Sequence, residues 1–76
     1  MNSNEETLKT EISNALEMLQ TALQGTAWTV YKTGTNGIIA YNTLTQQQTK
    51  TAYCFTADAF FSVVLAEIRA IEASNH

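Results

Sequence analysis

The residue types that most often perform catalysis are scarce in this chain. Histidine occurs once, as the final residue His76, and cysteine occurs once, as Cys54. A catalytic histidine must be held against its substrate, whereas chain ends fray, so we interpret His76 as a solvated tail. Cys54 would need a nearby base to become a thiolate nucleophile, and no histidine is expected to reach it. We therefore predict that Cys54 is a small, partly buried strand residue.

Metal and phosphate chemistry also lack their usual sequence patterns. Ligand spacings such as CxxC and HExxH do not occur. The glycines Gly25, Gly34 and Gly37 are predicted to mark a helix end and a turn, not a phosphate-binding loop. The carboxylates Glu11 and Glu17 fall on the polar side of a predicted helix, as in a solvated helix face. The sequence therefore predicts a protein that is not an enzyme and holds no cofactor and no metal.

Composition and charge narrow the classes of partner. The chain has 76 residues, of which 45% are hydrophobic, 7 are acidic and 4 are basic, for a formal net charge of −3. Nucleic-acid binding depends on clustered lysine and arginine, and the four basic residues here are scattered, so direct binding to nucleic acid is not expected. No apolar stretch approaches the ~20 residues of a membrane span. A lone cysteine fits a reducing compartment, so we predict a cytoplasmic protein with no membrane association.

Hydrophobic periodicity and turn residues divide the chain into helices and strands. Apolar residues recur at intervals of three and four near both ends, which is typical of amphipathic helices. Thr56 is a suitable N-cap for the second helix, and Gly25 a suitable C-terminal residue for the first. The expected elements of this single domain, residues 1–76, are a helix at about 4–24, a β-hairpin at about 27–43, a strand at about 49–55 and a helix at about 57–74.

The hairpin is predicted from Asn36-Gly37, a dipeptide that favours a type I′ turn. A loop of two or four residues there would place Ile39 and Tyr41 on the same face as Trp28 and Val30. We assign that more apolar face to the core. The opposite face is then exposed and is predicted to bind a partner protein; it comprises Tyr31, Ile38, Ala40 and Asn42.

The expected fold class is α+β, with the element order α-β-β-β-α. The simplest packing is a two-layer sandwich in which both helices cover one face of a three-stranded antiparallel sheet. This order is similar to that of double-stranded-RNA-binding domains, which hold phosphates with a basic cluster at the start of the last helix. The corresponding residues here, Thr56-Ala57-Asp58-Ala59, carry no positive charge. The similarity therefore implies a topology and not RNA binding.

The absence of catalytic groups favours a small non-catalytic protein-interaction module that acts by binding or occluding a partner protein. By compositional analogy, such compact acidic chains occur among phage and mobile-element accessory and inhibitor proteins. One alternative is a structural homodimer, with Phe61 and Leu65 as contacts at the edge of the last helix's wide apolar arc. Another is a subunit of a nucleic-acid-associated complex.

Overall fold

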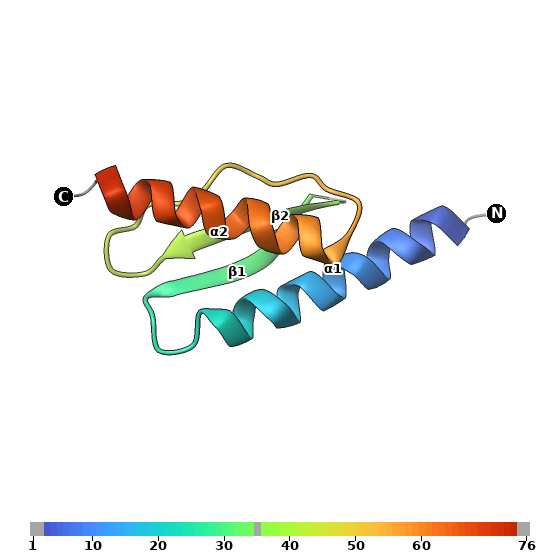
Figure 1. Cartoon of the computed structure of the whole chain (residues 1–76), viewed down its shortest axis with the longest axis horizontal. Coiled ribbons are helices and arrows are strands. Elements are labelled where there is room, and N and C mark those ends of the chain that lie inside the picture. Colours follow the sequence, from blue (N-terminus) through green and yellow to red (C-terminus); the bar gives the residue numbers. More distant parts are fainter. Residues whose placement is uncertain (1–2, 35, 75–76) are drawn as a thin grey trace.

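The computed structural model describes residues 3–34 and 36–74. They form an α+β arrangement in the order α-β-β-α, shown in Figure 1: α1 (Ser3–Ala22), β1 (Trp28–Thr33), β2 (Gly37–Asn42) and α2 (Ala57–Ser74). The molecule is elongated, with extents of 48 × 20 × 18 Å, and α1 begins at one end of the long axis while α2 ends at the other. Neither helix combines the length and apolar character that crossing a bilayer would require.

The first helix buries a single stripe, because its apolar residues recur at the helical period. The buried members are Ile12, Ala15 and Leu19, and Leu23, directly after the helix, continues the stripe. Gly25 follows the last turn with a φ of 80°, a left-handed conformation that glycine adopts without steric cost. The helix itself ends at Ala22, so the predicted end at residue 24 is two residues late, and Gly25 belongs to the turn that follows.

The second helix has two acceptors at its N-terminus. The Thr56 hydroxyl accepts a hydrogen bond from the backbone N–H of Ala59 at 3.1 Å, which confirms Thr56 as the N-cap. The Glu11 carboxylate, reaching across from α1, accepts a hydrogen bond from the N–H of Ala57 at 2.7 Å. The prediction of a solvated role for Glu11 is therefore wrong, since its side chain ties α1 to the first turn of α2.

The sheet has two strands and not three, which corrects the predicted α-β-β-β-α order. The stretch expected as a strand at 49–55 is not one. Residues 48–52 run alongside β2 but form only two isolated antiparallel bridges, Ile38↔Ala52 and Tyr41↔Gln48. The amino-acid types in this segment correctly indicated that its backbone is extended. They did not indicate that its hydrogen bonding to β2 is interrupted.

The interruption has a simple cause in the register of the two bridges. Between them, β2 contributes residues 39–40, whereas the neighbouring segment contributes residues 49–51. The extra residue breaks the ladder in the manner of a β-bulge. Thr49 compensates, because its hydroxyl accepts the hydrogen bond from Ala40 N–H at 3.0 Å while its own N–H donates to the Ala40 carbonyl at 2.9 Å. The buried backbone of Ala40 thus stays satisfied without a regular strand partner.

The length of the hairpin loop decides which side chains face the helices. The strands pair from Trp28↔Asn42 to Thr33↔Gly37, so the loop comprises residues 34–36. The predicted type I′ turn at Asn36-Gly37 is wrong: the left-handed glycine is Gly34, with a φ of 61°, and Gly37 is the first residue of β2. A loop of odd length shifts the register by an odd number of residues relative to either predicted loop, and this exchanges the two faces of β2.

Both helices pack on one side of the hairpin, which we call the inner face. Its residues in the hydrophobic core are Trp28, Val30, Ile38 and Ala40, joined by the buried stripes of α1 and α2. The core placement of Trp28 and Val30 is confirmed. The predicted face of Ile39 and Tyr41 is wrong, because the register places them with Tyr31 on the opposite side, the outer face, where Ile39 is nevertheless buried, at 8% exposed.

Candidate functional site

The outer face of the sheet gathers all three tyrosines of the chain. Tyr31 and Tyr41 come from β1 and β2, and Tyr53 comes from the segment that follows β2. Tyr31 is 45% exposed and Tyr53 is 72% exposed. Their neighbours on the same side are Ile39 and threonines, and none of these side chains is charged. We call this surface the tyrosine face; its members are Tyr31, Ile39, Tyr41, Tyr53, Thr29, Thr33 and Thr51.

Two features of the backbone bring Tyr53 to this surface. Ala52 exchanges two backbone hydrogen bonds with Ile38, at 3.1 and 2.8 Å, and its side chain is buried in the core. Because side chains alternate along an extended segment, Thr51 and Tyr53 point to the outer face. Gly37 then leaves room for them: a Cβ at this position would lie 3.2 Å from the Tyr53 ring and would collide with the Thr51 methyl group.

The structure does not bring together the four residues that the sequence predicted as the partner-binding face. Ile38 and Ala40 are fully buried on the inner face, so the prediction that they are exposed is wrong. Tyr31 lies on the outer face. Asn42 is half-buried at the end of β2, where its Oδ1 accepts hydrogen bonds from the N–H groups of Leu44 and Thr45, each at 2.9 Å. This geometry gives Asn42 a structural role, because it turns the chain out of the strand.

Sequence reasoning missed Ile39, Tyr41 and Tyr53 as members of the tyrosine face, in which Ile39 itself is only 8% exposed. The first two were assigned to the core by the assumed loop length. Tyr53 lies in a segment whose inward side could not be chosen from its alternation alone. A signal was present in that segment: Ala52 is the small residue that fits beneath the helices, and its neighbours are the large ones.

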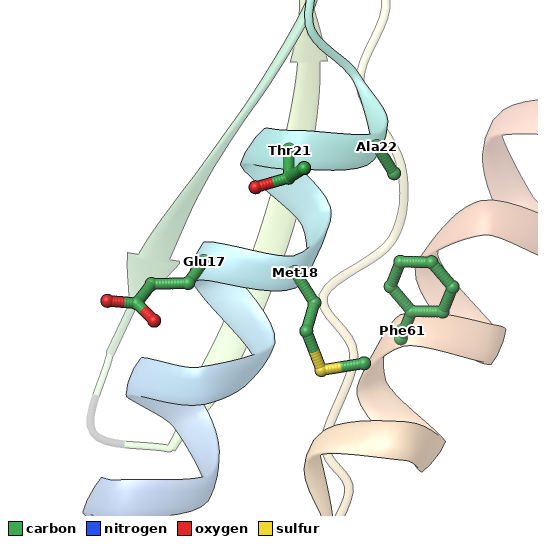
Figure 2. A pocket seen from close by; sticks show the side chains of 5 residues that line it. All are labelled: Glu17, Met18, Thr21, Ala22 and Phe61. Atoms are coloured by element: carbon green, nitrogen blue, oxygen red, sulfur yellow. The ribbon is translucent and has the colours of Figure 1, made fainter.

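A second surface feature lies between the helices, on the side away from the sheet (Figure 2). It is a shallow hollow lined by Glu17, Met18, Thr21, Ala22 and Phe61. Figure 2 shows Met18 and Phe61 projecting toward each other from α1 and α2, while the Glu17 carboxylate points away from Phe61. Phe61 and Leu65, the predicted dimer contacts, are both half-buried and packed against the core. Part of their apolar surface is therefore already used within the chain.

The described residues show what chemistry these surfaces can support. No group of three or more histidine, cysteine, aspartate or glutamate side chains gathers as a metal site within residues 3–34 and 36–74. Cys54 is a free, half-buried thiol, and His76 lies outside the described residues. The tyrosine face offers aromatic area together with phenol and threonine hydroxyls. Such groups bind by packing and neutral hydrogen bonds.

Comparisons with protein-family models, with curated proteins and with solved structures found no match to this chain.

Proposed function

We propose that this chain is a non-catalytic interaction module that binds a partner protein through its tyrosine face. The observation that carries the proposal is that the sheet side left open by both helices presents Tyr31, Tyr41 and Tyr53 with no charged side chain among them. Tyrosine is enriched in protein–protein contacts, whereas charged residues are depleted at their centres. The composition of the face therefore matches the centre of a protein interface.

The physical properties of tyrosine explain why such a face would bind. Each ring offers a large apolar area with only two side-chain torsions to immobilise, and its hydroxyl can pair at the rim. Ile39 lies between the tyrosines, opposite Tyr31, and is 8% exposed. A surface of this kind is organised before binding, which lowers the entropic cost of association.

The proposed cellular location and the proposed type of role both rest on the composition of the chain. The single cysteine supports a cytoplasmic location, and the small acidic chain fits an accessory or inhibitory protein that occludes a surface on its target.

Affinity capture with matched variants tests the proposal. The tagged chain, the double variant Tyr31→Ala/Tyr53→Ala and the control Val63→Ala would be compared on lysate from the source organism. The exposed fraction of Val63, 42%, is similar to the 45% of Tyr31, but Val63 lies on α2 and not on the tyrosine face. We expect a defined protein to be retained by the unmodified chain and the control, and to be lost from the double variant. Far-UV circular dichroism would show that all three are folded.

Two outcomes would contradict the proposal. One is equal retention of the captured protein by the double variant, which would exclude the tyrosine face as the contact. The other is loss of the captured protein upon Phe61→Ala alone with retention by the double variant, which would assign binding to the hollow between the helices.

A further inference from the structure

The hairpin loop leads into β2 through a dipeptide, Asn36-Gly37, whose two residues can react with each other. Asn36 is the only asparagine of the chain that a glycine follows. It is exposed, and its side chain has no hydrogen bond to any residue that the structure describes. By contrast, Oδ1 of Asn42 accepts hydrogen bonds from the N–H groups of Leu44 and Thr45. The Asn36 amide is therefore free to approach the backbone of the next residue.

Gly37 supplies the nucleophile for such a reaction, its backbone nitrogen. A side chain on the residue after an asparagine hinders attack on the asparagine amide, and glycine has none. The fold cannot give up this glycine, because an added Cβ would collide with the Thr51 methyl group and lie 3.1 Å from the Thr33 carbonyl oxygen. The crowding that requires glycine at position 37 therefore also leaves the Asn36 amide unhindered.

We infer that Asn36 is a site of spontaneous deamidation in the folded protein, through a succinimide formed with Gly37. A bond forms between the Gly37 nitrogen and Cγ of Asn36, and the bond from Cγ to Nδ2 breaks. The Gly37 amide proton leaves with Nδ2 as ammonia. Water then opens the five-membered ring at either carbonyl to give aspartate or isoaspartate. Neither step needs an oxidant, a metal or another protein.

The end of the sheet ladder must open before this reaction. Thr43 N–H donates to the Ala27 carbonyl at 2.9 Å, and hydrogen-bonded pairs recur at every second residue of an antiparallel ladder. Thr33↔Gly37 is therefore such a pair, with the Gly37 N–H directed at the Thr33 carbonyl. This pair is the last of the ladder, beside the loop. Because such ends open locally at a lower free energy than the whole domain, the reaction does not require unfolding.

The products differ from asparagine in charge and, for isoaspartate, in the length of the main chain. Both products place a carboxylate directly before Gly37, which is packed against Thr51 and Tyr53 of the uncharged tyrosine face. Isoaspartate also routes the main chain through the former side chain, which adds one carbon atom between residues 36 and 37. The modification therefore lengthens the loop that sets the register of β2.

Peptide mapping by mass spectrometry tests the site. The purified chain would be incubated at neutral pH for weeks, and isoaspartate would be detected by enzymatic methylation. We expect Asn36 to convert to a mixture of aspartate and isoaspartate while Asn14, in α1, and Asn42 keep their amides. Asn36→Gln is the matched control, because glutamine must close a six-membered ring, which is much slower. An unchanged Asn36, or equal conversion of Asn42, would overturn the inference.

The dependence of the rate on global stability tests whether the folded protein reacts. The rate at Asn36 would be measured in buffer and in enough urea to unfold the chain, and in buffer for the variant Ile68→Val. Ile68 is 3% exposed in the second half of α2, so this variant destabilises the whole domain.

Local opening predicts that the rate in buffer is slower than the rate in urea by less than the equilibrium ratio of folded to unfolded chain. Ile68→Val should then leave the rate in buffer unchanged. A rate in buffer reduced by the whole ratio, and raised about fivefold by Ile68→Val, would show that only the unfolded chain reacts. That result would overturn the inference.

Discussion

Gly37 is a position where a single methyl group should be costly. Its φ is not in the left-handed region, so the requirement for glycine comes from space and not from backbone conformation. An added Cβ would collide with the Thr51 methyl group and lie 3.1 Å from the Thr33 carbonyl oxygen. We expect Gly37→Ala to lower the free energy of unfolding in urea by about 1–3 kcal/mol, as overpacking does.

A second substitution separates crowding from other causes. Thr51→Ser removes the methyl group in the way and should recover part of the loss in the double variant Gly37→Ala/Thr51→Ser. The control is Gly34→Ala, where a Cβ meets nothing within 4 Å but the φ of 61° carries strain. Thr51→Ser should not rescue Gly34→Ala. Equal behaviour at both glycines would show that crowding at Gly37 is not the cause.

At the scale of elements, the contact between Glu11 and the start of α2 should contribute measurably to stability. The carboxylate accepts the N–H of Ala57 and places negative charge at the positive end of the helix dipole. We expect Glu11→Ala to lower the free energy of unfolding by about 1 kcal/mol, the usual value of a lost N-terminal cap. Chemical denaturation followed through Trp28 fluorescence would measure it.

Glu17→Ala is the matched control for this element. Glu17 lies on the same helix, is exposed, and is not one of the acceptors at the N-terminus of α2 among the described residues, so its removal should change stability by no more than about 0.5 kcal/mol. Both variants gain the same helix propensity. Equal losses of stability would refute the capping role of Glu11.

The helices could be predicted from the sequence because their information is local. Stripes such as Ile12, Ala15 and Leu19 recur at the helical period, and Thr56 and Gly25 are residues whose chemistry suits helix ends. The sheet could not be predicted to the same degree. Which face of β2 is exposed depends on whether the hairpin loop has an odd or an even number of residues. Either case gives β2 a large aliphatic residue, Ile38 or Ile39, that could face the helices. The segment at 49–55 fails as a strand because of one extra residue, which composition does not reveal.

At the scale of the whole molecule, binding through the tyrosine face should depend little on salt. Its members are uncharged, so association would release few counterions. We expect the Kd for the captured partner protein to change by less than about threefold between 50 and 200 mM salt, a range over which nucleic-acid complexes with many phosphate contacts weaken by roughly a thousandfold or more. Fluorescence anisotropy across that range would measure it.

A steep fall in affinity with salt would instead support the alternative of a nucleic-acid-associated complex. The four basic residues would then be the contacts to substitute first, beginning with the exposed Lys32 in β1 and the exposed Lys50 in the segment beside β2.

The hairpin loop at residues 34–36 has a consequence for how this protein can change over evolutionary time. Deleting or inserting a single residue there would turn β2 over, so that Ile38 and Ala40 became solvated while Tyr41 was forced beneath the helices. Replacing one loop residue by another leaves that arrangement intact. Descendants should therefore diverge freely in the identity of these residues while keeping the interval from Trp28 to Tyr41 constant. That fixed interval would be a more durable mark of ancestry than any single amino acid on the surface.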